Sequence, residues 1–308
     1  MKPFLIVNPR SAAGRTGRHF DRIARAVRGA VGDFECAFTE RCGDGVRLAQ
    51  EAVRAGGKLV VAVGGDGTAS EVVDGLSAFE PPREPDALFG FIPRGTGGDL
   101  RRTLGLPQDL DAAARVLASR NAIVCDVGRI SYVGSDGAPA ARHFANVAGF
   151  GVSGVVSAGV NRGLKLRSGK LAFMLASARA LIGWSDKRVR WRADEGPWRE
   201  DAITALSVCN GRYFGGGMQV APDARIDDGH FDVVLWSGFG LGDFVTKRRM
   251  LHDGTHWTLP NTRVLRARTL EAEPLGDAPV LLDVDGEQPG RLPARIWILP
   301  RALGVRVA

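Results

Sequence analysis

The sequence predicts a fold of two parts, a parallel α/β sheet followed by a β-sandwich. In the first 120 residues, short apolar runs alternate with longer segments of helical periodicity, which is typical of a parallel sheet with helices on both faces. From about Asp126 onward, short strand-like runs separated by turn residues dominate, which indicates antiparallel sheets. With 308 residues and a hydrophobic content of 44%, the chain is long enough for two such domains.

The elements expected in the first part follow this alternation. Strands are expected where the chain is continuously apolar, and helices where apolar residues recur every three or four positions, as Phe20, Ile23 and Val27 do. The expected strands are Phe4–Val7, Phe34–Phe38, Leu59–Val63 and Leu88–Ile92. The expected helices are Arg15–Gly29, Gly45–Ala55 and Ala69–Phe79.

The second part is expected to be mainly β-structure, because turn signals separate its apolar runs. The expected strands are Arg142–Val147, Arg188–Trp191, Ile203–Cys209, Phe231–Trp236, Val280–Val284 and Ile296–Leu299. Two helices, Gly169–Gly183 and Gly240–Leu251, are expected to interrupt them. We predict domains of residues 1–126 and 127–295, and leave open whether the C-terminal strand, 296–308, returns to the first domain.

The composition narrows the class of protein. A formal net charge of +7 and a pI near 9.7 suit an anionic partner, and equally suit a soluble protein from an arginine-rich proteome. Four scattered cysteines indicate a reducing compartment rather than a disulfide framework. No signal peptide is visible, and the most apolar helix candidate, Leu171–Trp184, is too short to span a bilayer. We therefore expect a cytoplasmic protein.

The stretch VVAVGGDGTASEV, residues 60–72, carries an acid between glycines where an apolar strand leads into a helix. Glycines let backbone N–H groups approach a ligand closely, and the N-terminus of the next helix favours an anion, so Gly64, Gly65 and Gly67 predict a phosphate site. Asp66 would repel a bare phosphate but suits a phosphate that arrives with Mg²⁺, or a metal-bound water. The structural alternative, a tight turn in which Asp66 or Thr68 caps the helix, stays open.

Two further glycine-rich segments follow other expected strands, NPRSAAGRTG after the first and PRGTGGDLRR after the fourth. The carboxyl ends of parallel strands lie at one edge of the sheet, where such folds bind ligands, so we expect these loops to gather there. Gly95, Thr96 and Asp99 repeat the combination of glycine, hydroxyl and acid, although Asp99 suits a helix cap equally well. The chain lacks G-x-x-x-x-G-K-[ST], which excludes a P-loop ATPase.

The hexapeptide GFGVSG, Gly149–Gly154, matches the dinucleotide pattern G-x-G-x-x-G. A dinucleotide site needs an acid about 20 residues further on. No Asp or Glu lies between Gly154 and Trp184. We therefore reject a dinucleotide site here and expect glycines that allow close packing at turns lining an interdomain cleft.

These motifs, in this order, resemble the diacylglycerol kinase catalytic-domain family, which includes bacterial lipid kinases and sphingosine and ceramide kinases. NPRSAAG is similar to its N-P-x-S-G motif, GGDGT is its signature, and PRGTGGDLRR resembles P-x-G-T-x-N-D-x-A-R. The segment CNGRYFGGGMQVAPDARIDDGHFDVVL, residues 209–235, resembles N-x-x-x-x-G-G-G followed by P-x-A-x-x-D-D-G-x-L-D-V, and LDVDGE, residues 282–287, matches D-G-E. The resemblance covers nearly the whole chain, and five ordered motifs are far more specific than GGDG, which NAD kinases and phosphofructokinases share.

The resemblance implies an α/β nucleotide-binding domain, with a parallel sheet like that of NAD kinases and phosphofructokinases, joined to a β-sandwich domain for the lipid substrate. It assigns ATP binding to residues 1–126 and lipid binding to residues 127–295, with ATP and the lipid headgroup meeting in the cleft. The nucleotide-binding residues that it implies are Asn8, Thr39, Gly64, Gly65, Asp66, Gly67, Thr68, Ala69, Ser70, Gly95 and Thr96.

The resemblance also implies catalytic roles for Asp66 and Glu287, with Glu287 as the proton acceptor from the lipid hydroxyl. Residue chemistry agrees, because a hydroxyl nucleophile benefits from a carboxylate within hydrogen-bond reach. A Mg²⁺ site is implied at Asp228, with Arg225 and His230 as backbone ligands. The alternatives are a solvated turn carboxylate at position 287 and an ordinary hairpin at DDG. Two family asparagines are absent, because Gly98 and Ser70 stand in their places.

A lipid kinase must reach a bilayer, and one segment of the sequence suits that task. Between Arg162 and Arg192 the chain has nine Lys or Arg and one acid, Asp186. Apolar residues, among them Leu175 and Ile182, recur there at helical spacing, and a basic amphipathic segment favours an anionic membrane. A helix packed on the sandwich with a solvated basic rim explains the same pattern.

The leading interpretation is an ATP- and Mg²⁺-dependent lipid kinase that acts on a diacylglycerol-like lipid at a membrane surface. A kinase of a soluble substrate such as NAD and a non-catalytic nucleotide-sensing protein are the alternatives. We expect peripheral membrane association and no nucleic-acid partner, and we leave a homodimer open.

Overall fold

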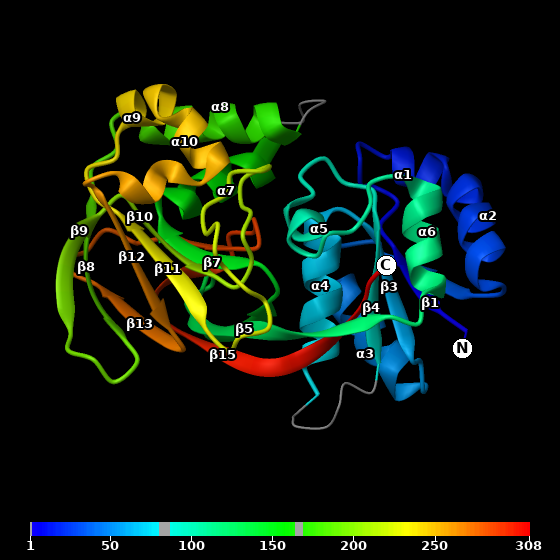
Figure 1. The fold of residues 1–308 in the computed structure, drawn as a ribbon. Helices are drawn as coiled ribbons and strands as arrows, with labels where there is room; N and C mark the ends of the chain where they lie inside the picture. The colour runs from blue at the N-terminus through cyan, green and yellow to red at the C-terminus, as the bar shows by residue number, and fades with distance from the viewer. Residues whose placement is uncertain (1, 80–86, 164–168) are drawn as a thin grey trace. The chain divides into compact units, whose positions relative to one another are not determined.

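The computed structural model describes residues 2–79, 87–163 and 169–308 (Figure 1). The chain divides into two compact units. Unit 1 comprises Met1–Val127 together with Pro300–Ala308, and unit 2 comprises Gly128–Leu299. The predicted fold class, a parallel α/β sheet followed by a β-sandwich, is confirmed by the strand order within these units.

Unit 1 is built on a parallel sheet with the strand order β2-β1-β3-β4-β15. The predicted strands are confirmed with end shifts of no more than one residue. They are β1 (Phe4–Val7), β2 (Glu35–Phe38), β3 (Leu59–Gly64) and β4 (Leu88–Pro93). The last residues of the long strand β15 (Gly290–Arg306) pair with β4, Gly304 opposite Leu88 and Val305 opposite Phe89. The C-terminus therefore completes this sheet.

Helices cover both faces of the sheet (Figure 1). On one face, α2 (Phe20–Val31) and α6 (Leu110–Ala118) pack on the apolar side of the strands. On the other lie α3 (Asp44–Arg54) and α4 (Asp66–Ser77), which pack against each other. Two short helices, α1 (Arg15–Arg18) and α5 (Asp99–Thr103), follow the glycine-rich loops.

Two local features of unit 1 differ from expectation. The helix expected at Arg15–Gly29 is interrupted at His19, because the first turn is held against the preceding loop by a hydrogen bond from the Gly17 N–H to the Pro9 carbonyl. The helix α6 was not expected from the sequence. Its start is marked by Asp109, whose side chain caps the helix by accepting from the Ala112 N–H at 2.9 Å.

Unit 2 contains a β-sandwich of two antiparallel layers. One sheet has the order β12-β11-β10-β7-β14, formed by Thr262–Ala267, Phe231–Trp236, Ala205–Cys209, Val147–Gly151 and Leu282–Val284. The other joins β15 to β13 (Thr269–Pro274), β8 (Lys187–Ala193) and β9 (Arg199–Ile203), and β5 (Ala122–Gly134) pairs with β15 and β6 (Pro139–Phe144).

The two layers of unit 2 enclose its main core. Phe150 and Leu206 of the first sheet pack with Trp191, Leu270 and Ile296 of the second, and all five are almost completely buried. The strands β5, β12 and β13 were missed in the sequence, and the predicted strands include only one residue each of β7 and β9. Charged and small residues interrupt their apolar patterns, so only tertiary pairing identifies them as strands.

Four helices gather on the other face of the five-stranded sheet (upper left in Figure 1). They are α7 (Val152–Gly163), α8 (Gly169–Leu181), α9 (Leu241–Thr246) and α10 (Arg248–Asp253), followed by the 3₁₀ turn Thr255–Thr258. The helix expected at Gly240–Leu251 is divided at Lys247. No described helix is both long and apolar enough to cross a bilayer.

The glycines of Gly149–Gly154 lie at the end of β7 and the start of α7, and they do allow close packing. A Cβ on Gly149 would lie 2.7 Å from the Leu206 carbonyl oxygen, and one on Gly154 would lie 2.3 Å from the Leu281 carbonyl oxygen. They form a strand-to-helix junction rather than the expected turns.

Candidate active site

The first and third strands of unit 1 end in loops that are joined through side chains. The Asn8 side-chain amide donates to the Thr68 hydroxyl at 3.1 Å, and the Ser11 hydroxyl donates to the Asn8 carbonyl at 3.0 Å. Thr68 in turn packs against Gly64, where a Cβ would lie 2.4 Å from the Thr68 Oγ1 atom. Glycine is therefore required at position 64 for this junction to form.

The loops after β3 and β4 touch backbone to backbone. A Cβ on Gly95 would lie 2.5 Å from the Gly65 Cα atom, closer than real Cβ contacts. The Arg94 N–H also donates to the Gly64 carbonyl at 2.6 Å. These glycines lie beside the N-terminus of α4, and a glycine loop at a helix N-terminus is an arrangement that binds phosphate.

Asp66 connects the same two loops through its carboxylate. Its Oδ2 atom accepts from the Gly98 N–H at 2.6 Å and the Asp99 N–H at 3.3 Å, and its Oδ1 atom accepts from the Leu100 N–H at 3.3 Å. These N–H groups begin α5, so Asp66 caps a helix that follows a different loop. Its catalytic assignment stays a prediction, and the structure adds a positioning role.

The other predicted nucleotide residues differ in how far they reach the surface. Gly95 and Thr96 are exposed, and Gly65 and Gly67 are half-buried. Thr39, Thr68, Ala69 and Ser70 are buried, so those residues shape the loops from inside. Asp99 is the first residue of α5 and pairs with Arg102 at 2.9 Å, but the N-cap is Gly98, so the cap role that was left open for Asp99 is wrong.

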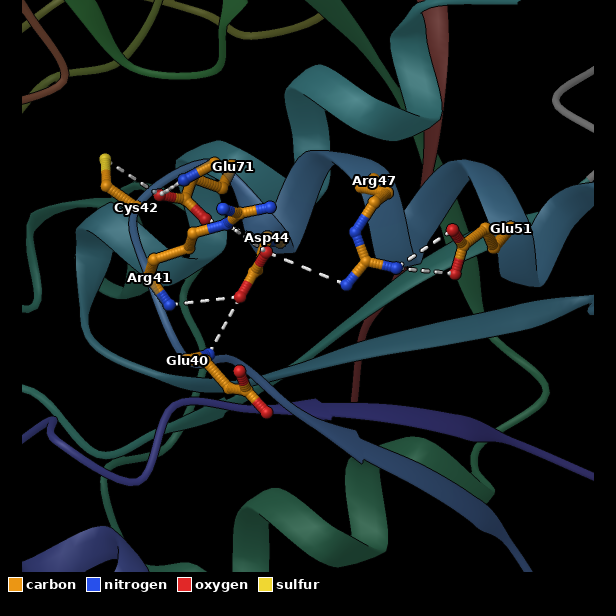
Figure 2. A network of polar contacts seen from close by, with 9 residues as sticks. Glu40, Arg41, Cys42, Asp44, Arg47, Glu51 and Glu71 are labelled. Atoms are coloured by element: carbon orange, nitrogen blue, oxygen red, sulfur yellow. Dashed lines mark hydrogen bonds and ion pairs between the residues drawn. The ribbon is translucent and has the colours of Figure 1, made fainter.

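A polar network missed in the sequence fixes the loop between β2 and α3 (Figure 2). The Asp44 carboxylate accepts from the Glu40 and Arg41 N–H groups at 2.8 and 3.0 Å, and these two bonds lower the pKa of Asp44. Glu71, on α4, accepts from the N–H groups of Gly43 and Gly45, each at 2.9 Å. The loop after β2 is thus tied to the helix that begins in GGDGT.

This network borders a polar hollow beside Thr39. The hollow has a volume of about 340 Å³ and is lined by Phe38, Glu40, Arg41, Asp44 and Arg47. Two charged side chains of each sign line it, together with one aromatic ring. The sequence contains a signal for this hollow. Thr39 and Asp44 are close together in the sequence and follow a strand of the parallel sheet, where ligands bind in such folds.

In unit 2, Glu287 follows a tight two-residue turn. Val284 and Glu287 exchange backbone hydrogen bonds of 2.8 and 3.0 Å, and the two turn residues, Asp285 and Gly286, have φ values of 50° and 87°. The Asp285 carboxylate accepts from three successive N–H groups, those of residues 145–147, at 2.9–3.1 Å. Glu287 is therefore a half-buried carboxylate on a rigidly anchored hairpin.

This anchoring also explains why the expected strand Arg142–Val147 is broken. Ala145 and Asn146 give their N–H groups to Asp285 instead of to a neighbouring strand. The break separates β6 from β7, so the chain turns from one sheet of the sandwich into the other at this point.

The implied Mg²⁺ ligands lie in the loop before β11. Asp228 accepts from the His230 N–H at 3.1 Å and forms an ion pair with Arg266 at 2.5 Å, while Arg225 is exposed and pairs with Asp227. Within the described ranges, no three His, Cys, Asp or Glu side chains form a group able to hold a metal. The Arg266 guanidinium occupies one oxygen of the Asp228 carboxylate, so an ion there would compete with it, and the metal assignment stays a prediction.

An apolar cavity lies in unit 2 between the helical layer and the five-stranded sheet. It has a volume of about 90 Å³, and its lining includes Phe173 of α8, Phe244 of α9, Leu251 of α10 and Trp236 of β11. Among the described lining residues, four carry hydroxyl groups, Ser153, Ser177, Thr204 and Ser207. Such a space suits hydrocarbon far better than a charged or heavily hydrated ligand.

The basic segment expected to contact a membrane is described only in part. Lys165 and Arg167 lie outside the described residues, as does the side chain of Lys170. On α8, Leu181 is buried in the helical layer, whereas Leu175 is 45% exposed, and Ile182, directly after the helix, is 67% exposed. One side of this segment packs on the sheet and another faces solvent.

Comparisons with known proteins match both parts of the chain. Residues 2–130 match the family described as diacylglycerol kinase catalytic domain, and residues 146–307 match the YegS C-terminal NAD kinase beta sandwich-like domain. A probable lipid kinase YegS-like protein of Stenotrophomonas maltophilia is 30% identical over 299 residues, which cover 96% of this chain and 93% of that protein. A diacylglycerol kinase of Bacillus subtilis is 28% identical over 302 residues, which cover 98% of this chain and 94% of the relative.

Solved structures show the same fold. The crystal structure of a diacylglycerol kinase from Bacillus anthracis superposes with a TM-score of 0.71 at 23% identity, covering 100% of this chain and 97% of that one. Yeast NADH kinase, at 10% identity, covers 99% of this chain and 82% of its own with a TM-score of 0.51.

Proposed function

Because the chain belongs to the diacylglycerol kinase catalytic-domain family, we propose that it transfers the γ-phosphoryl group of ATP to a hydroxyl group of a membrane lipid. ATP binding, the first part of this proposal, is supported by the cluster of three loops at the carboxyl ends of β1, β3 and β4. The close approach of Gly65 to Gly95 brings the backbones of two of these loops together beside the N-terminus of α4, a position that suits phosphate oxygens.

Different loop residues are proposed to bind different parts of ATP. Backbone N–H groups of the glycine loops bind the phosphates, and Asp66 keeps the two loops in register by capping α5. The polar hollow beside Thr39 is the proposed place for the rest of the nucleotide. Mg²⁺ bound to ATP would neutralise part of the phosphate charge. Asp66 is engaged with backbone N–H groups, so we propose that the ion enters with the nucleotide.

The lipid half of the proposal rests on the apolar cavity in unit 2. A hydrocarbon chain gains about 0.8 kcal/mol for each methylene removed from water, and the cavity offers a lining that is apolar except at its hydroxyl groups. We propose that it receives part of an acyl chain of a diacylglycerol-like lipid. A soluble substrate such as NAD is the less favoured alternative, because the part of the cavity lining that the structure describes has no cation to pair with its phosphates.

Glu287 is the proposed proton acceptor. In this reaction the lipid hydroxyl oxygen bonds to the γ-phosphorus, the bond to the bridging oxygen of ADP breaks, and the hydroxyl proton passes to the Glu287 carboxylate. The hairpin that holds Glu287 limits its freedom, which is the main requirement for a group that must act at one geometry.

We also propose peripheral membrane association through a surface that we name the helical rim. It consists of exposed apolar residues on neighbouring helices, Leu175 and Ile182 at α8 and Val245 on α9, with the exposed cations Arg179 and Arg248 beside them. Apolar side chains next to cations suit an anionic bilayer surface, which takes up both kinds of group.

The experiment that tests the function offers labelled ATP to the purified protein with vesicles containing diacylglycerol and an anionic lipid. The expected result is a labelled phospholipid that requires vesicles. Parallel reactions contain NAD, a total lipid extract, or no acceptor. Transfer only to NAD would favour the soluble kinase, and ATP binding without transfer to any acceptor would favour a sensor.

A further inference from the structure

Asp283 is a buried carboxyl group to which the proposed reaction assigns no part. It is the central residue of β14, and only 2% of its surface is exposed. It lies opposite Gly149 in the pairing of β14 with β7, and α7 packs on both of these strands. Because Gly149 has no side chain, the carboxyl group has space under the helix.

The contacts of Asp283 point to the turn that carries Glu287. Its Oδ1 atom accepts from the Gly286 N–H at 2.9 Å, and the Ser157 hydroxyl on α7 also bonds to the carboxyl group. Its Oδ2 atom has no hydrogen-bond partner among the residues that the structure describes. The Asp283 carboxyl group therefore links α7 to the Asp285–Gly286 turn, and its Oδ2 atom is the one that can carry a proton without losing either contact.

The charge state of Asp283 follows from its surroundings. Burial is the largest effect and raises its pKa to about 8, against the hydrogen bonds from Ser157 and Gly286, which lower it. The charged groups that act on it are the carboxylates of Asp285 and Glu287, and both raise its pKa further. At pH 7 the neutral acid is therefore the favoured form of Asp283 in the folded protein.

Two carboxyl groups thus hold the turn from different sides. Asp285 ties it to the N–H groups of residues 145–147, and Asp283 ties the Gly286 N–H to α7 through Ser157. Gly286 adopts a φ of 87°, in the left-handed region that favours glycine, so a defined partner for its N–H fixes the orientation of the next residue, Glu287.

We infer that Asp283 is a positioning residue for Glu287: it holds the Asp285–Gly286 turn from inside unit 2 and connects that turn to α7 through Ser157. This inference rests on the proposed role of Glu287 as the proton acceptor. A group that acts only through geometry should change turnover while leaving both substrate affinities nearly unchanged.

The first test compares Asp283→Ala with Asp283→Asn. The alanine variant loses the acceptor for the Gly286 N–H, so we expect kcat to fall by more than about tenfold with both KM values within about threefold. The asparagine side chain matches a neutral carboxyl group in shape and keeps the acceptor oxygen, so kcat should recover to within about threefold of the wild type at pH 7. Amide hydrogen exchange at Gly286 should become faster in the alanine variant only.

A second pair of variants covers the case in which Asp283→Ala does not fold. Ser157→Ala removes the hydroxyl group that bonds to Asp283. Thr262→Val is the control, because it removes a buried hydroxyl group on β12 that has no hydrogen-bond partner among the residues that the structure describes. We expect slower turnover and faster Gly286 exchange in Ser157→Ala than in Thr262→Val. Equal values in this pair would overturn the inference.

The exchange measurement separates this inference from the proposed function. If the protein transfers no phosphate, or if Glu287 is dispensable, Gly286 exchange still reports whether Asp283 holds the turn. Wild-type turnover together with unchanged Gly286 exchange in Asp283→Ala would mean that Asp285 alone anchors the hairpin, and Asp283 would have no positioning role.

Discussion

Three acidic residues beside glycines play different parts because their surroundings differ. Asp66 accepts from backbone N–H groups of a neighbouring loop, and Asp285 accepts from N–H groups of residues 145–147. Glu287 directly follows the two-residue turn of its hairpin. A carboxylate that accepts several N–H groups is fixed and acts as an anchor. Asp66 and Asp285 therefore act as anchors, whereas Glu287 is the carboxylate proposed to take the proton.

Glu287→Gln should separate chemistry from binding. The amide keeps the size of the side chain and a hydrogen-bond acceptor but cannot take a proton, so kcat should fall by about 10²–10⁴. ATP affinity should stay within a few-fold, because the nucleotide loops belong to unit 1 and Glu287 to unit 2. Steady-state kinetics and a separate nucleotide-binding titration measure both effects. Normal turnover in this variant would return Glu287 to the role of a turn carboxylate.

Asp283→Asn should change how stability depends on pH. Burial raises the pKa of Asp283 from 3.8 to about 8, so between these values the folded state holds a proton that the unfolded state has lost. The free energy of unfolding contributed by this group therefore falls as the pH rises through that window. Asparagine cannot ionise, so at about pH 8.5 the free energy of unfolding of the variant should exceed that of the wild type by a few kcal/mol. The pKa difference limits this increase to about 6 kcal/mol.

Urea unfolding of both proteins at about pH 5 and pH 8.5 measures this difference. The gain should be much smaller at the lower pH, where Asp283 keeps its proton in the folded state. A gain of the same size at both pH values would show that ionisation of Asp283 does not limit stability.

At the scale of elements, each glycine loop is shaped by another loop. The approach of the β3 loop to the β4 loop depends on glycine in both, and the loop after β2 depends on Asp44 and on Glu71 from α4 (Figure 2). The nucleotide cradle is thus one cooperative arrangement of loops, so a change in one loop should disturb ligands held by the others.

Gly95→Ala tests this dependence. The added Cβ would lie 2.5 Å from the Gly65 Cα atom, and because that neighbour is backbone, the two loops must move apart. We expect ATP affinity to fall by more than about tenfold, or ~1.4 kcal/mol. Gly29→Ala is the matched control, since no atom lies within 4 Å of its added Cβ on α2. An equal ATP affinity for the two variants would contradict contact between the loops in the nucleotide site.

The helical rim is the second element whose role can be tested directly. Ile182→Glu and Val245→Glu place a negative charge on its two most exposed apolar positions. Each should weaken sedimentation with vesicles of about 30 mol% anionic lipid by roughly tenfold, because the carboxylate is repelled and no longer enters the interface. Ile123→Glu, at an exposed apolar position of unit 1, is the control and should bind normally. Equal binding by all three variants would exclude the rim as the docking surface.

At the scale of the whole molecule, the positive charge and the two-unit organisation suit an enzyme that works at an anionic surface. The net charge of +7 attracts such a surface over a distance that salt controls, since the Debye length falls from about 10 Å at 0.1 M to 3 Å at 1 M. Binding to the bilayer and binding to ATP should therefore respond differently to ionic strength.

Raising NaCl from about 0.05 M to 0.5 M should weaken vesicle binding at least tenfold. Turnover of a short-chain lipid dispersed without vesicles should stay within about twofold, because the groups proposed to act on it are partly buried. Co-sedimentation and the labelled-ATP assay measure the two quantities in the same buffers. If vesicle affinity did not change with NaCl concentration, apolar contacts alone would hold the protein on the membrane.

The sequence by itself determined the features that depend on neighbouring residues. The strands Phe4–Val7 and Phe231–Trp236 occupy the predicted residues, because a continuous apolar run between turn signals needs no distant partner to be recognised. The glycine loops, the family and the fold class follow from local spacing as well. Helix ends were less well predicted, since the divisions at His19 and Lys247 arise from contacts and local dihedral angles rather than from apolar periodicity.

Only the tertiary structure decided which groups meet. Asp66 reaches N–H groups 32 to 34 positions away, and Asp285 reaches N–H groups 138 to 140 positions away. The burial of Asp283 depends on Gly149 opposite it and on α7 above it, and the Arg266 partner of Asp228 comes from β12, a strand that the sequence analysis missed. The residue type and its spacing determine which chemical roles a group can take. Its burial and its partners determine which of these roles it has, and both arise only when the chain folds.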